Sequence, residues 1–180
     1  VLTPIMADVR ERLDVVEQWM AGQDTFEWVR PSGGVVGLVR FRDEVEVDEA
    51  GNLWAYLRGE TPDTLVVGSH LDSVPKGGWL DGALGVMSGL ELLRSIAADG
   101  TPPITVALVD WADEEGARFS RSLFGSGAVM GTLDVDILRG LTDKEGGKLP
   151  EILAEHGVDL DTLDGAQTRL QDVKAYVEVH

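Results

Sequence analysis

A histidine and an aspartate, His70 and Asp72, follow a short apolar run at residues 65–68 that ends in glycine. Such a run predicts a buried strand, and the alternation of side chains along it directs both residues to the same side. A carboxylate beside an imidazole can accept one ring N–H and leave the other nitrogen free to bind a metal ion. The pair is a candidate ligand with its supporting acid, although ordinary polar strand ends show the same spacing.

Asp81 stands at the start of a predicted helix that extends to about residue 98. An acid in this place can cap the helix by accepting backbone N–H groups, and it complements the helix dipole. Because a carboxylate has two oxygens, the same side chain could also bridge two cations. Three glycines, Gly82, Gly85 and Gly89, indicate close packing of this helix against a sheet.

A second apolar run, at residues 104–109, leads directly into a group of acids, Asp110, Asp113, Glu114 and Glu115. A solvated acidic loop is one interpretation of such a group. The apolar strand before it and the tryptophan within it favour a partly buried cluster instead. Adjacent glutamates could then divide the work, one binding metal and the other moving protons.

These residues belong to stretches that together resemble one enzyme family. The family is the zinc-dependent amidohydrolases of the M20 peptidase superfamily, in the branch of N-carbamoyl-L-amino acid hydrolases, allantoate amidohydrolases and β-ureidopropionases. The stretches are GSHLDSVP at 68–75, GG at 77–78, DGALGV at 81–86, EEGARF at 114–119, SLFGS at 122–126 and YVEVH at 176–180. The last stretch resembles a strand whose histidine replaces an acidic ligand of the related peptidases.

The resemblance implies a set of metal ligands. His70, Asp81 and His180 would hold one ion, and Asp81 and Glu115 would form part of a second site. Imidazole and carboxylate ligands suit zinc, manganese, cobalt or nickel, so we expect two divalent ions as cofactors.

The resemblance also implies a reaction. Glu114 would be the general base, with Asp72 assisting in catalysis. Water activated by the two ions would attack a ureido or amide carbonyl, and Glu114 would return the proton to the leaving nitrogen. The expected substrate is a small N-carbamoyl-L-amino acid or a related ureido acid.

The implied fold is an α/β domain with a parallel or mixed sheet flanked by helices. Similarity is good from about residue 52 to residue 180. Family members have a last histidine ligand near their C-terminus and an inserted lid or dimerisation domain. We therefore expect residues 1–180 to form the N-terminal part of a longer catalytic domain, inactive alone and homodimeric in its full-length form.

Composition restricts the class of partner. The chain has 15 basic and 32 acidic residues, a formal net charge of −17, which argues against nucleic acid and anionic membranes. It has no cysteine, so a metal site must use histidine and carboxylate ligands. No stretch approaches the roughly 20 apolar residues that cross a bilayer. We therefore expect a cytoplasmic protein.

The remaining elements support the site. Residues 6–20 have the spacing of an amphipathic helix, and residues 44–48 and 52–57 predict a hairpin whose acids face solvent. Strand, helix and strand between residues 65 and 110 predict a parallel crossover, whose ligands lie at the C-terminal strand ends. Residues 133–170 have the composition of a polar connector with short helices, such as 149–156, and His156 is expected at the surface.

Other functions stay open at this level. An aminoacylase or peptidase of the same superfamily is the nearest alternative, although His180 and the Arg118-Phe119 pair favour carbamoyl substrates. Arg118 and Arg121 could orient an anionic substrate, but pairing with nearby acids is the favoured interpretation. From another class, the chain could be a non-catalytic binding or assembly module.

Overall fold

The computed structural model describes residues 45–78 and 80–180, short pieces at 14–15, 17–18 and 21–22, and the backbone of strands at 26–29 and 38–41. The chain forms two compact units, Val1–Val45 and Glu46–His180. In the first, β1 (Phe26–Val29) pairs with β2 (Leu38–Phe41) in antiparallel register. Residues 14–15 and 17–18 are helical, and the rest of the helix predicted at 6–20 lies outside the described residues.

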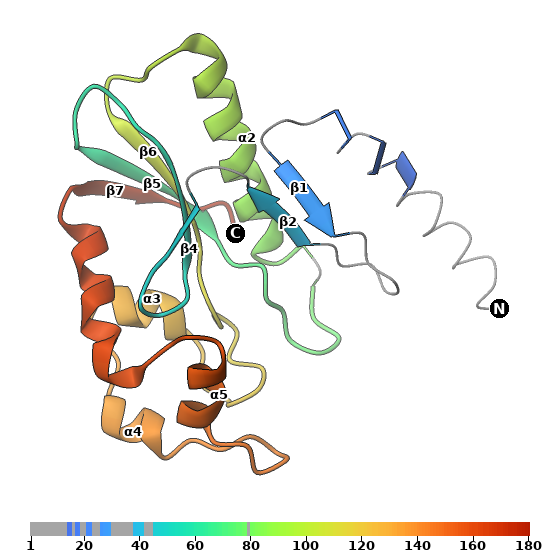
Figure 1. The fold of residues 1–180 in the computed structure, drawn as a ribbon, viewed down its shortest axis with the longest axis vertical. Coiled ribbons are helices and arrows are strands. Elements are labelled where there is room, and N and C mark those ends of the chain that lie inside the picture. The colour runs from blue at the N-terminus through green and yellow to red at the C-terminus, as the bar shows by residue number, and fades with distance from the viewer. Residues whose placement is uncertain are drawn as a thin grey trace. The chain divides into compact units, whose positions relative to one another are not determined.

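A mixed five-stranded sheet, in the order β3-β4-β6-β5-β7, organises the second unit (Figure 1). Strand β4 runs antiparallel to β6, whereas β5 runs parallel to both β6 and β7. The prediction of a parallel or mixed sheet is therefore confirmed. The strands are β3 (Val45–Val47), β4 (Leu53–Leu57), β5 (Thr64–Ser69), β6 (Thr105–Asp110) and β7 (Val173–Val177).

Helices cover both faces of this sheet. Helix α2 (Ala83–Asp99) connects β5 to β6 and packs on one face, where Leu93 joins Val67 and Leu108 in a small core. A larger core on the other face is covered by shorter helices (Figure 1). These are α3 (Phe124–Val129), α4 (Val135–Arg139), α5 (Leu149–Glu155) and the 3-10 helix η1 (Leu160–Leu170). The predicted parallel crossover is thus formed, and it directs the ends of β5 and β6 to one edge.

The predicted hairpin between β3 and β4 is present, but its acids do not all face solvent. Asp48 is only 6% exposed. Its carboxylate accepts hydrogen bonds from the backbone N–H of Ala50 and Asn52, both at 3.0 Å. It also accepts from Asn52 Nδ2 at 2.9 Å and Trp54 Nε1 at 2.8 Å. The solvent-facing interpretation is wrong for Asp48, because the turn after it and Trp54 of β4 surround its carboxylate with donors.

The interpretation of residues 133–170 as a polar connector is also wrong. The short helices are present, and His156 is exposed as expected, but the segment contributes much of the larger core. Its apolar residues are widely spaced among charged ones, so composition concealed the buried side of each helix. The buried residues are Leu138, Leu149, Val158, Leu160, Leu163 and Ala166.

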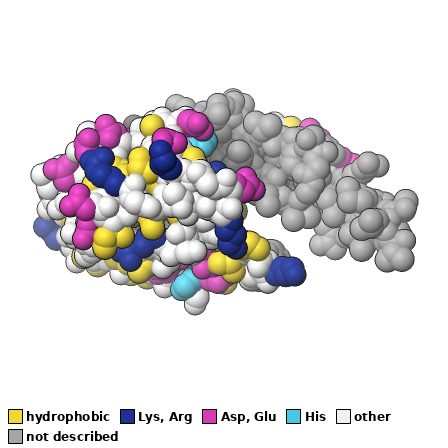
Figure 2. Space-filling view, turned by 90° about the horizontal axis from the view of Figure 1, so that it is seen from below, with side chains coloured by type: hydrophobic (Ala, Val, Ile, Leu, Met, Phe, Trp, Pro, Cys, Tyr) yellow, Lys and Arg dark blue, Asp and Glu magenta, His cyan; other side chains and the backbone are white. Residues whose placement is uncertain are grey.

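Figure 2 shows one face on which acidic, basic and apolar side chains are interspersed. Within the described part of the chain, no helix has both the length and the apolar character needed to span a membrane.

Candidate metal centre

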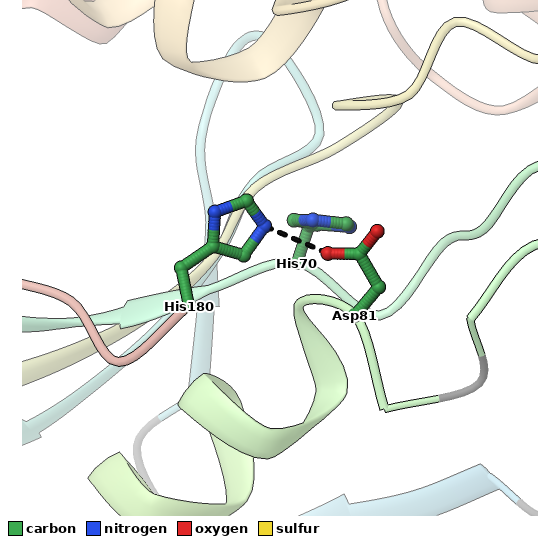
Figure 3. Close-up of side chains that lie close together, drawn as sticks. All are labelled: His70, Asp81 and His180. Atoms are coloured by element: carbon green, nitrogen blue, oxygen red, sulfur yellow. Dashed lines mark ion pairs between the residues drawn. The ribbon is translucent and has the colours of Figure 1, made fainter.

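Three of the predicted ligands converge although they are far apart in the sequence. His70, Asp81 and His180 each offer one ligand atom, and these atoms lie within 4.8 Å of one another. His70 follows β5, Asp81 precedes α2, and His180 follows β7 (Figure 3). His180 Nε2 lies 2.8 Å from an oxygen of Asp81. The two imidazole rings meet edge to face, with centroids 5.6 Å apart.

His70 is the buried member of this group, with 1% of its surface exposed. Its Nδ1 lies 2.9 Å from the backbone carbonyl oxygen of Asp72, and 3.4 Å from the Asp72 carboxylate. The carbonyl, rather than the predicted carboxylate, is therefore the hydrogen-bond partner of the ring. Among the described residues, His70 Nε2 is the one buried side-chain nitrogen or oxygen without a hydrogen-bond partner.

That orphan nitrogen fits a metal ligand. A buried polar atom without a partner is rare because its desolvation is not compensated. With Nδ1 donating its proton to the Asp72 carbonyl, Nε2 keeps a free lone pair, and His70 belongs to the group formed with Asp81 and His180. Two imidazoles and a carboxylate are a donor set that zinc and similar divalent ions accept.

The backbone around His70 leaves room only for glycine at position 82. Gly82 has a φ of 72°, and a Cβ there would lie 2.4 Å from the carbonyl oxygen of His70 and 2.5 Å from its ring. Gly82, not Asp81, occupies the N-cap position of α2, and no side chain caps this helix. The capping role predicted for Asp81 is therefore wrong, and the carboxylate contacts His180 instead.

The acidic loop after β6 is half-buried, which confirms the partly buried interpretation. Its backbone is held by Asp72, whose carboxylate accepts the N–H of Glu114 at 3.2 Å and of Glu115 at 3.0 Å. No local sequence pattern predicts this contact, since it joins two loops that follow different strands. Asp72 thus fixes the two glutamates relative to His70.

Glu114 is the acid of this loop that is paired with the imidazole cluster. Its Oε2 is 3.6 Å from His70 Nε2, and its side chain is 22% exposed. Burial raises the pKa of Glu114, the charges of His70 and His180 oppose that rise, and those of Glu115 and Asp72 reinforce it. A raised pKa makes this carboxylate a stronger base, which favours a role in proton transfer.

Two other acids of the loop also have raised pKa values. Burial raises the pKa of Asp110 to about 6, although the N–H of Leu71 donates to its carboxylate at 2.9 Å. Burial and the nearby charge of Asp72 raise the pKa of Asp113. Crowded carboxylates at one sheet edge favour a bound cation, which would relieve their repulsion.

Glu115 does not belong to the group that converges on His70 in the described part of the chain. Its role as a ligand of a second ion stays a prediction. Arg118 donates to Asp143 at 2.8 Å, as its structural interpretation predicted, and Arg121 is exposed.

An apolar cavity of about 240 Å³ adjoins Glu114. It lies between the sheet and α3, and the sequence did not indicate it. Its lining is formed by Trp54, Val66, Trp111, Glu114, Leu123, Ser126, Val129, Met130, Leu170, Val173, Tyr176 and Glu178.

Comparisons with known proteins agree with the family expected from the sequence motifs. The profile of a family described as Peptidase family M28 matches residues 52–137. An N-carbamoyl-L-amino acid amidohydrolase of Geobacillus stearothermophilus is 40% identical over 173 residues, which cover 84% of this chain and 42% of that protein. An allantoate amidohydrolase of Escherichia coli is 33% identical over 172 residues, covering 94% of this chain and 39% of the relative.

A solved structure shows the same relationship. A hydantoinase/carbamoylase family amidase from Burkholderia ambifaria matches with a TM-score of 0.61 and 33% identity, over 76% of this chain and 33% of that one. The chain thus spans about two fifths of the length of the two curated relatives. Sequence relatives and fold agree: the chain belongs to the hydantoinase/carbamoylase family of amidohydrolases, related to the M28 and M20 peptidases.

Proposed function

We propose that the protein containing this chain is a metal-dependent hydrolase of linear amides that removes the carbamoyl group of N-carbamoyl-L-amino acids. The observation that carries the proposal is the unpartnered Nε2 of buried His70, a residue that forms a possible metal-binding group with Asp81 and His180. The relatives named N-carbamoyl-L-amino acid amidohydrolase support the choice of reaction. Residues 1–180 would be the N-terminal part of the catalytic domain.

His70, Asp81 and His180 would hold one divalent ion, and Asp81 and Glu115 would contribute to a second. When bound, such ions polarise a carbonyl and make a water molecule more acidic. Zinc fits the donor set, and manganese, cobalt or nickel would fit as well. The burial of His70 against Gly82 keeps its ring in one orientation for this task.

Glu114 would move the proton. Its Oε2 lies beside His70 Nε2, where it can accept a proton from the attacking water. The oxygen of that water bonds to the ureido carbon, the C–N bond breaks, and Glu114 delivers the proton to the departing nitrogen. Asp72 would keep Glu114 in place through the backbone N–H groups of the loop.

The apolar cavity beside Glu114 favours a carbamoyl amino acid with an apolar side chain. Allantoate, which carries two polar ureido groups, gains little from such a lining. Allantoate hydrolysis is nevertheless a second candidate, since the allantoate amidohydrolase of Escherichia coli aligns with 94% of this chain.

The net charge of −17 supports a small-molecule substrate rather than nucleic acid or an anionic membrane. We propose that the complete protein is a homodimer, as the family resemblance implies, and that it is located in the cytoplasm.

The test begins with metal binding by the 180-residue chain, measured by titration calorimetry with Zn²⁺. We expect binding in the original chain and its loss in Asp81→Ala. A non-catalytic module would bind no ion at this cluster, and that result would overturn the proposal.

Activity is then measured in the complete protein on N-carbamoyl-L-methionine, allantoate and a dipeptide. Glu114→Gln should retain metal but lose about 10²–10⁴-fold in kcat, the usual contribution of general acid–base catalysis. Glu155→Gln, at an exposed position of α5, is the matched control and should keep full activity. Undiminished turnover in Glu114→Gln would remove this residue from the reaction.

A further inference from the structure

Two imidazoles of the candidate centre extend beyond the paired part of the sheet. The parallel pairing of β5 with β7 ends at Val67 and Val177. His70 and His180 each lie three residues beyond that last pair. Strand β5 continues to Ser69, but there it pairs with β6 on its other side. Contacts other than strand pairing therefore set the separation of the two histidines.

The side chain of Glu178 connects the ends of β5 and β7 beyond their last paired residues. Ser69, directly before His70, donates its hydroxyl to Glu178 Oε1 at 2.5 Å. The hydroxyl of Tyr176 lies 2.8 Å from Glu178 Oε2 and donates to it. Trp111, which follows β6, donates its ring N–H to the Tyr176 hydroxyl at 2.9 Å. One carboxylate thus joins the ends of β5 and β7, with support from the loop after β6.

Helix α2 closes the same region from another side. A Cβ at Gly85 would lie 2.4 Å from the backbone oxygen of Val179 and 2.7 Å from Cβ of Ser69. Val179 stands between Glu178 and His180 in the chain. The segment that carries His180 is therefore held between the Glu178 bridge and the first turn of α2.

We propose that Glu178 is a positioning residue, which sets the distance between His70 and His180 by binding Ser69 and Tyr176. The inference rests on the proposed function, in that these histidines are taken to hold a metal ion. Glu178 itself does not belong to the ligand group. Residues that support ligands in this way typically change metal affinity 10–100-fold when they are replaced.

The alternative is that Glu178 acts only through its negative charge, which attracts cations. Ser69→Ala separates the two possibilities, since it removes the donor and leaves the charge. If Glu178 positions the histidines, Ser69→Ala and Glu178→Ala should each raise the Kd for Zn²⁺ by 10–100-fold. The double variant should lose little more than either single one, because both remove the same bridge.

Glu178→Gln is the conservative variant. Its amide oxygen can still accept the Ser69 hydroxyl, so its Kd should lie closer to that of the original chain than the Kd of Glu178→Ala does. Glu155→Ala, an exposed acid of α5, is the control for loss of a charge and should leave the Kd unchanged. A Kd unchanged in Ser69→Ala but raised in Glu178→Gln would establish the charge effect and overturn the positioning role.

A second measurement does not depend on metal. The rings of His70 and His180 lie close enough for a nuclear Overhauser effect between their protons in the metal-free chain. Ser69→Ala should weaken that signal, and an undiminished signal would contradict the positioning role. If the original chain binds no metal, the proposed function fails, while the ring-to-ring signal still decides whether Glu178 orders the histidines.

Discussion

Two buried polar side chains of the second unit, Asp48 and His70, differ in whether all of their polar atoms have hydrogen-bond partners. The Asp48 carboxylate accepts four hydrogen bonds, three from the turn that follows it and one from Trp54 of β4. His70 is buried even more completely, yet one of its two ring nitrogens has no partner. The two side chains illustrate two roles of buried polar groups. A satisfied buried group stabilises the fold, whereas an unsatisfied one is held ready for a ligand.

The energetic difference follows from desolvation. A buried donor or acceptor without a partner costs about 1–3 kcal/mol, and a satisfied one contributes a modest net gain. At His70 the folded chain carries this desolvation cost, and several carboxylates are crowded together nearby. Replacing Asp48 should therefore lower stability and leave metal binding unchanged. Replacing His70 should abolish metal binding and change stability little.

The largest expected effect on stability is at Asp48. Asp48→Ala removes the acceptor for the N–H groups of Ala50 and Asn52 and for two side-chain donors. Several buried donors lose their partner together, so we expect the free energy of unfolding to fall by about 3–5 kcal/mol. Urea unfolding followed by tryptophan fluorescence measures this. Asp48→Asn, which keeps one acceptor oxygen, should lose less.

The same variant tests the comparison itself. The part of the Asp48→Ala population that stays folded should bind Zn²⁺ with the affinity of the original chain, because the turn is outside the ligand group. A stability loss below about 1 kcal/mol would mean that water replaces the carboxylate at little cost. The turn would then not be the structural counterpart of the His70 site.

Sequence patterns are sufficient to predict the parallel strand–helix–strand crossover that positions the site. The apolar runs before His70 and Asp110 predicted parallel strands, and the glycine spacing after Asp81 predicted a closely packed helix. Their convergence with His180 could not come from spacing, because long-range contacts leave no local pattern; it came from the resemblance to a family. The prediction for Asp48 is wrong because the alternation over residues 44–48 indicates an exposed face, while the turn after β3 redirects the chain.

Asp110 is an intermediate case, and it gives a pH test. Its carboxylate accepts one hydrogen bond, from Leu71, and burial raises its pKa from 3.8 to about 6. The folded state then binds this proton more tightly than the unfolded state does. Stability from Asp110 is complete below about pH 4 and is lost as pH rises to about 6.

Asp110→Asn removes that titration while keeping an acceptor for Leu71. We expect the metal-free variant to be more stable than the original chain at pH 7–8 by about 2–3 kcal/mol, since one pKa unit corresponds to about 1.4 kcal/mol. The difference should shrink toward pH 4. Urea unfolding at several pH values measures it, and Asp136→Asn at an exposed position of α4 is the control. A difference that does not vary with pH would exclude Asp110 as the group that titrates.

The smallest stability effect is expected at His70, although this change should be the most damaging to metal binding. His70→Leu loses the hydrogen bond to the Asp72 carbonyl but also removes the unpartnered nitrogen. The two contributions oppose each other, so the metal-free chain should change by less than about 1 kcal/mol in either direction. Adding Zn²⁺ at 100 times its Kd should stabilise the original chain by about 2.7 kcal/mol and leave His70→Leu unchanged.

This last measurement completes the comparison, because Asp48→Ala should retain the increment from Zn²⁺ that His70→Leu loses. Thermal unfolding with and without Zn²⁺ in the three chains is enough to observe it. If His70→Leu instead destabilises the metal-free chain as strongly as Asp48→Ala does, the imidazole is a structural core residue. The unpartnered nitrogen would then have a partner in solution, and His70 would not be a metal ligand.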